Sequence, residues 1–137
     1  MVVLTLAAFL GVLQNGFVNW DDPVNFLDNP RYRGLGPAQL RWMFTTVHMG
    51  HYIPLTWLTL GADYLVWGMD PMGYHLTSLL FHAATALCFY AVARTLLARA
   101  LPVGTPDAGI VLGAAAAALF FSVHPLRVES VAWVTAR

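Results

Sequence analysis

The chain has 137 residues, of which 58% are hydrophobic and only 10% are charged. Soluble domains carry about 25% charged residues, so this composition excludes an ordinary water-soluble globule and predicts an all-α integral membrane protein. Its seven basic residues are all arginine and balance seven acidic residues, and the absence of a basic cluster excludes nucleic acid as a partner.

The apolar run over residues 2–13 predicts a first helix, only about 18 Å long, which is shorter than the roughly 30 Å hydrocarbon core of a bilayer. It has neither the basic start nor the small-residue cleavage site of a signal peptide. We interpret it as a transmembrane helix without its cytoplasmic end. Residues 132–137 stop inside a helical pattern, so both ends predict a fragment of a longer protein.

Residues 14–72 predict a long loop that is too long to be passive in a compact protein. Near its start, Asp21 and Asp22 are followed by Pro23, and this order suits Asp22 as a helix cap. Residues 37–47 and 54–69 predict two helices at the membrane interface, because Asp63 would be costly at the bilayer centre.

Residues 74–98 give the clearest transmembrane helix. A polar stripe on one of its faces should point toward other helices or a cavity rather than lipid; it consists of His75, Ser78, His82 and Thr85. Residues 106–123 predict the next transmembrane helix. Small residues recur there at every fourth position and predict a close-packing face; they are Gly109, Gly113 and Ala117.

The distribution of charge predicts the orientation of these helices. The short loop 99–105, with Arg94 and Arg99 close to it, is expected on the cytosolic side. The loop 14–72 has three arginines against five aspartates, a net charge of −2, and is expected in the periplasm or lumen. Two crossings, 74–98 and 106–123, then return the chain to that side. The protein is thus predicted to be multi-pass, in a bacterial inner membrane or the endoplasmic reticulum.

Two groups of polar residues are candidates for chemistry. The Asp21 and Asp22 carboxylates can act as a general base or together bind a divalent metal; alternatively, Asp22 only caps a helix and Asp21 is solvated. His124, Arg127 and Glu129 follow the second crossing and are candidates for substrate binding, although Glu129 could equally cap a helix or orient an arginine. Three histidines are further candidates. His51 could bind a headgroup, a phosphate or a metal. We interpret His75 and His82 as partners in interhelical hydrogen bonds rather than as catalytic residues.

Three motifs together resemble a known family. The stretches Val18–Pro23, His51–Trp57 and His124–Trp133 are similar to the N-terminal part of polytopic membrane proteins that carry C-terminal tetratricopeptide repeats. These proteins are similar to the transmembrane O-mannosyltransferases and, more distantly, to the protein O-mannosyltransferases, which have the C-type glycosyltransferase fold. The resemblance covers nearly the whole chain.

The resemblance implies a glycosyltransferase that uses a polyprenyl- or dolichyl-phosphate sugar as donor and a protein Ser or Thr hydroxyl as acceptor, with mannose as a candidate sugar. Asp21 would be the general base, and Asp22 would orient the acceptor or help to hold a divalent metal. Arg127 would steady the departing phosphate. No cofactor and no fixed metal ligand are assigned, and the chain alone is expected to be inactive.

Two other functions are compatible with the residues. A non-catalytic membrane anchor for a tetratricopeptide-repeat scaffold predicts that Asp21 and Asp22 can be replaced without loss. A proton- or ion-coupled transporter that uses His75 and His82 predicts acidic residues within the spans. Residues 74–98 contain none, and residues 106–123 contain only Asp107, at the very start of the helix, which counts against this function.

Overall fold

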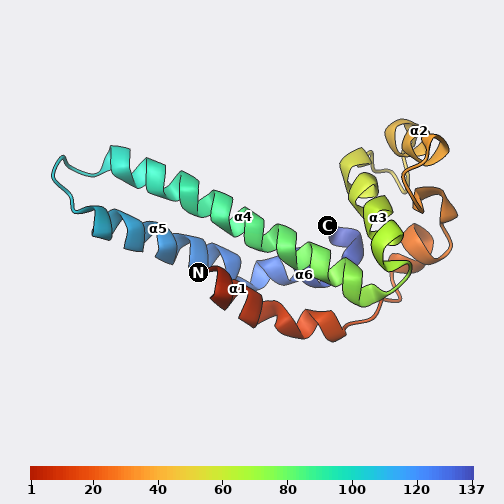
Figure 1. Ribbon diagram of the computed structural model, residues 1–137, viewed down its shortest axis with the longest axis horizontal. Coiled ribbons are helices and arrows are strands. Elements are labelled where there is room, and N and C mark those ends of the chain that lie inside the picture. Colours follow the sequence, from red (N-terminus) through yellow and green to blue (C-terminus); the bar gives the residue numbers. More distant parts are fainter.

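Two long antiparallel helices form the spine of the computed structural model, which describes residues 1–137 (Figure 1). α4 covers Pro71–Ala100 and α5 covers Asp107–Ser122. α4 begins at a proline, and the Asp70 side chain caps it by accepting a hydrogen bond from the Met72 N–H at 3.0 Å. The predicted helices over 74–98 and 106–123 therefore both form.

The face of α5 that packs on α4 differs from the predicted one. Its buried residues are Ile110, Ala114, Ala118 and Ser122. Gly109, Gly113 and Ala117 are exposed. Small side chains do recur at every fourth position, as a close approach of two helices requires, but the series is displaced by one residue. In a run with this many small residues, the spacing alone does not distinguish two neighbouring faces.

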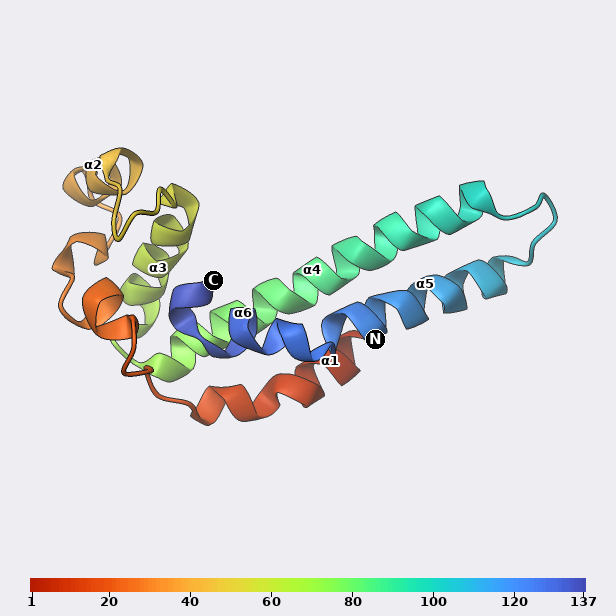
Figure 2. The same ribbon diagram turned by 180° about the vertical axis from the view of Figure 1, so that it is seen from behind.

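The N-terminal segment lies alongside this hairpin. α1 covers Val2–Phe9 and continues as a 3₁₀ helix over Leu10–Gln14, and both views place it along α4 (Figure 2). The Thr5 hydroxyl donates to Ser122 Oγ at 2.8 Å, and the Phe9 ring meets the His82 ring edge-on, with centroids 5.2 Å apart. The predicted first helix thus forms over residues 2–9, and its last turn tightens.

The segment between α1 and α4 folds against the N-terminal end of α4. It contains a π-helix at Pro23–Leu27, a 3₁₀ helix at Pro30–Tyr32, α2 at Pro37–Thr45 and α3 at Pro54–Trp67. After α5, the chain returns to the same region through a 3₁₀ helix at Pro125–Arg127, α6 at Val128–Ala132 and a 3₁₀ helix at Val134–Ala136 (Figure 1).

An aromatic core joins these elements. Its buried members come from six different segments and are Phe26, Tyr32, Met43, Trp57, Leu60, Tyr74 and Val134. The approach of α3 to the preceding loop requires a glycine, because a Cβ on Gly61 would lie 2.7 Å from the Gly34 carbonyl oxygen and 2.9 Å from that of Tyr32. This packing places the polar loop at one end of the hairpin.

One helix, α4, is long and apolar enough to cross a membrane by length and composition. α5 and the following Pro125–Ala132 segment pass the same test only as a pair, which bends by 59°. The Val2–Gln14 segment is apolar but shorter. The structure is entirely helical apart from an isolated bridge between His48 and His51, which confirms the all-α class, whereas three membrane crossings remain a prediction.

The Tyr32 hydroxyl gives the core a dependence on alkaline pH. Burial raises the pKa of Tyr32 above its ordinary value of 10.0. The folded protein therefore holds this proton more tightly than the unfolded chain, so its contribution to stability is complete below pH 10 and is lost as the pH rises through the folded-state pKa.

We expect Tyr32→Phe to remove the contribution of the Tyr32 hydroxyl to this pH dependence. Near neutral pH the variant should be less stable by about 1 kcal/mol, because the hydroxyl pairs with Tyr74 Oη at 3.2 Å and contacts Met69 Sδ at 3.4 Å. Above pH 10 the difference from the wild type should shrink. Thermal unfolding of both proteins in detergent micelles, below and above pH 10, measures the difference in stability. A difference that stays constant across this pH would contradict the expectation.

Candidate active site

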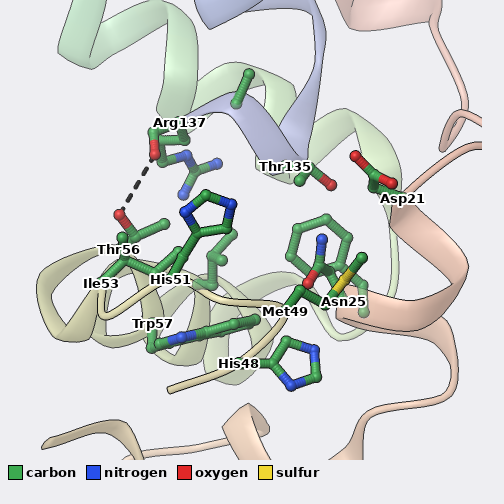
Figure 3. Close-up of a pocket in the computed structure, with 13 residues that line it drawn as sticks. Asp21, Asn25, His48, Met49, His51, Ile53, Thr56, Trp57, Thr135 and Arg137 are labelled. Carbon is green, nitrogen blue, oxygen red and sulfur yellow. Dashed lines mark hydrogen bonds between the residues drawn. The ribbon is translucent and has the colours of Figure 1, made fainter. Parts of the chain in front are cut away.

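A cavity of about 270 Å³ lies where the polar loop meets the C-terminal segment (Figure 3). The loop contributes Asp21 and Asn25, the start of α3 contributes Thr56 and Trp57, and the C-terminal segment contributes Thr135 and Arg137. Thr56 Oγ1 donates to the Arg137 carbonyl oxygen at 3.3 Å and joins two of these walls. Residues more than 100 positions apart thus enclose a single site.

Asp21 provides the accessible carboxylate of this cavity. Its backbone carbonyl accepts a hydrogen bond from the Asn25 N–H at 3.0 Å, within the turn that leads into the π-helix. Its side chain is half-buried and takes part in no hydrogen bond or ion pair with the rest of the chain. Figure 3 shows it at the edge of the cavity, next to Thr135. A carboxylate in this position is free to accept a proton from a bound hydroxyl.

Asp22 has a different environment, although it is the next residue. Its side chain is fully buried and accepts three hydrogen bonds: from Val18 N at 2.6 Å, Trp133 Nε1 at 3.1 Å and Thr135 Oγ1 at 2.5 Å. Three donors compensate the burial of the carboxylate. Asp22 precedes Pro23 at the start of the π-helix, as predicted, but its side chain makes no capping bond there. It neither lines the cavity nor is solvated, and it ties the loop to the C-terminal segment.

A tight turn brings two histidines to the cavity. His48 and His51 exchange backbone hydrogen bonds of 3.0 and 2.9 Å around Met49 and Gly50. Both central residues have positive φ angles, 47° and 82°, as in the two-residue turns that favour glycine. His51 is exposed and faces the cavity (Figure 3), and the His48 ring packs against Trp57 with centroids 5.5 Å apart.

A buried ion pair closes another side of the cavity. Asp63 of α3 and Arg137 pair directly, and their side chains are 6% and 8% exposed. Arg137 also donates to Ser78 Oγ at 3.0 Å and to the Tyr74 carbonyl at 2.6 Å, and Thr77 donates to Asp63 at 2.6 Å. Asp63 is thus inside the protein rather than in contact with lipid. The sequence shows that Asp63 would be costly to bury in a bilayer, but it does not show that Arg137, 74 positions later, is its partner.

The second predicted cluster does not line this cavity. His124 uses Nδ1 to accept a bond from the Leu126 N–H at 3.3 Å and packs on Phe120, and Glu129 is exposed. Arg127 lies in a separate cavity of about 190 Å³, with its guanidinium 4.5 Å from the centre of the Phe121 ring. Instead of the predicted cluster, Thr135, Ala136 and Arg137 of the C-terminal segment line the Asp21 cavity.

The predicted polar stripe of α4 turns inward over most of its length. His75, Ser78 and His82 are buried, whereas Thr85 is exposed and bonds to its own helix. His82 Nε2 pairs with the Ser122 carbonyl at 2.8 Å, which confirms the interhelical hydrogen bond predicted for it. The His75 ring nitrogens have no hydrogen-bond partner. No three His, Cys, Asp or Glu side chains in the chain gather into a group that could hold a metal ion.

The chain is similar to proteins named as O-mannosyl-transferases. It is 33% identical over 142 residues to protein O-mannosyl-transferase Tmtc1 of Drosophila melanogaster, and the match covers 98% of this chain and 15% of that protein. It is 32% identical over 148 residues to protein O-mannosyl-transferase TMTC3 of Mus musculus, covering 100% of this chain and 14% of that protein. The human TMTC3 is 31% identical, with the same coverage.

These matches confirm the similarity to the transmembrane O-mannosyltransferases that the three motifs indicate. The chain spans only 14–15% of the length of these curated relatives. No protein-family model matches it, and no solved structure matches it significantly.

Proposed function

We propose that these residues belong to a multi-pass membrane glycosyltransferase. It transfers a sugar, with mannose as the first candidate, from a polyprenyl- or dolichyl-phosphate donor to Ser or Thr hydroxyls of proteins. The cavity beside Asp21 faces the lumen or periplasm. The observation that carries this proposal is a free carboxylate in an open cavity. It belongs to the Val18–Pro23 stretch, one of the three motifs by which the sequence resembles the transmembrane O-mannosyltransferases, and the chain as a whole is 33% identical to one protein of that name.

In this mechanism Asp21 removes the proton from the acceptor hydroxyl as that oxygen attacks the anomeric carbon of the donor. The new bond forms between the acceptor oxygen and the anomeric carbon. The bond from that carbon to the phosphate oxygen breaks, the phosphate leaves with the electron pair, and the configuration inverts. Asp22 does not touch the reacting atoms; through Thr135 and Trp133 it holds the wall of the cavity in place.

Arg127 is the residue best suited to the donor phosphate. It forms no ion pair within the chain, and its cavity, which shares Arg137 with the Asp21 cavity, also contains the rings of Phe81 and Phe121. A cation beside aromatic rings suits a phosphate attached to an apolar chain. His51, which faces the Asp21 cavity, is the candidate for contact with the acceptor or the sugar.

The test is sugar transfer by the full-length protein in lipid nanodiscs. Radiolabelled mannose on a polyprenyl or dolichyl phosphate should pass to an acceptor protein, and alkaline β-elimination should release it, as expected for a Ser or Thr linkage. Nucleotide-activated mannose without the lipid carrier should give no product. Absence of transfer from every lipid-linked hexose offered would overturn the proposal in favour of a membrane anchor.

A further inference from the structure

A second cavity, of about 450 Å³, lies between the loop that precedes α2 and α2 itself. Its volume falls within the range of about 300–1,000 Å³ that is usual for ligand sites. Its walls are mostly polar and include Asp28, Asn29, Arg31, Trp42, Thr46 and His48. None of these residues takes part in the chemistry proposed for Asp21, so the cavity has no role in the function as described so far.

The polar groups of this second cavity favour a ligand without net charge. Asp28 and Arg31 contribute one charge of each sign, so neither an isolated phosphate nor an isolated cation is preferred. Trp42 adds an aromatic surface, and Thr46 adds a hydroxyl. A ligand that matches this lining offers both hydrogen-bond donors and acceptors along its length, as a polypeptide backbone does.

Asn29 supplies the most specific signal. Its side chain is 8% exposed, and Oδ1 accepts a hydrogen bond from the Arg31 N–H at 3.1 Å. Nδ2 is buried without any partner. A buried donor without an acceptor is destabilising and is uncommon in folded proteins. A carbonyl oxygen that enters the second cavity would provide the missing acceptor.

The second cavity lies next to the Asp21 cavity and shares one lining residue with it. His48 lines both, and its Nε2 is also buried without a hydrogen-bond partner. A ligand that occupied both spaces would have to pass over His48 and be longer than either of them. This arrangement favours an extended peptide over a single sugar, which would fill only one of them.

We propose that the second cavity is a subsite for the acceptor polypeptide. It binds the backbone of residues that flank the acceptor Ser or Thr, while the hydroxyl itself lies beside Asp21. Asn29 donates to a backbone carbonyl, and Trp42 packs against an adjacent residue. This assignment rests on the proposed function, because it takes the Asp21 cavity as the place of transfer.

The experiment measures binding in the absence of any donor. Two fluorescent acceptor peptides are titrated onto the full-length protein in nanodiscs: a blocked Ser residue alone, and a longer neutral peptide that extends it on both sides. Asn29→Asp keeps the acceptor for the Arg31 N–H but removes the donor, and Arg31→Ala is an independent second variant. Arg41→Ala is the matched control, because this exposed arginine of α2 lines neither cavity.

We expect both variants to weaken binding of the longer peptide by about tenfold, which corresponds to 1.4 kcal/mol, and to leave binding of the short acceptor unchanged. Asn29→Asp should also lower the unfolding temperature, because it buries a carboxylate oxygen without a partner, whereas Arg31→Ala, at an exposed residue, should leave it unchanged. Equal affinity of the two peptides for the wild-type protein would overturn the subsite. Competition by free mannose or a mannose disaccharide against the flanking residues would instead assign the cavity to sugar. Length-dependent binding without sugar transfer would retain the subsite and overturn the proposed activity.

Discussion

Asp21→Asn should lower sugar transfer by the full-length protein by a factor of about 10²–10⁴, the usual contribution of a general base. The amide has nearly the same shape but cannot take the proton of the acceptor hydroxyl. Since the Asp21 side chain makes no hydrogen bond within the chain, the fold should tolerate the change. Binding of the acceptor peptide should therefore persist while the rate of transfer falls. The measurement is the initial rate with radiolabelled lipid-linked mannose.

Two further aspartates make this experiment specific. Asp107→Asn changes an aspartate that pairs with Arg94 at 3.3 Å on the surface, where both side chains are at least half exposed, and it should leave transfer unchanged. Asp22→Asn should lower stability by about 1–3 kcal/mol, because three donors lose a charged acceptor. A variant of Asp21 that transfers at the wild-type rate would exclude this residue as the base.

The adjacent acids show what sequence reasoning can and cannot supply. Their position after an apolar helix indicates a site at a membrane surface, and the proline that follows indicates where the next helix begins. Neither feature separates their roles. The difference arises because Trp133 and Thr135, more than 110 positions away, supply donors to Asp22 and not to Asp21. Such a pairing depends on the tertiary structure and has no local signal.

The helices could be predicted because the signals for them are local in the sequence. Apolar residues over 74–98 and small residues over 106–123 act within one helix or between neighbours, so their periodicity is visible in the sequence. The predicted packing face of α5 is displaced by one position, because Gly113 and Ala117 have the same four-residue spacing as the buried Ala114 and Ala118. The role of Arg137 was not predicted, because an arginine at the end of an amphipathic segment usually lies in solvent.

The pair Asp63–Arg137 should have the largest effect on stability. Removing one partner, by Asp63→Leu or Arg137→Met, leaves a buried charge without its counterpart and should lower the free energy of unfolding by about 3–5 kcal/mol. The loss should be similar whichever of the two partners is removed. Asp63 would retain only Thr77 as a donor, and Arg137 only Ser78 and the Tyr74 carbonyl as acceptors.

Replacing both residues at once separates the ion pair from the rest of the fold. Asp63→Leu combined with Arg137→Met removes both charges and should recover most of the loss, because apolar side chains can replace a buried ion pair with little penalty. The surface pair provides the comparison: Arg94→Ala and Asp107→Asn, separately and together, should each change stability by less than about 1 kcal/mol. Urea unfolding in detergent micelles measures all six variants.

Transfer by the double variant then tests what this pair would do in the proposed glycosyltransferase. Arg137 and Thr135 belong to the same short segment, which forms one wall of the Asp21 cavity. If the ion pair fixes that wall, the double variant should be stable but transfer sugar more slowly, with the KM for the acceptor raised. If its KM and rate match those of the wild type, the pair serves stability alone, and Asp22 is sufficient to position the segment.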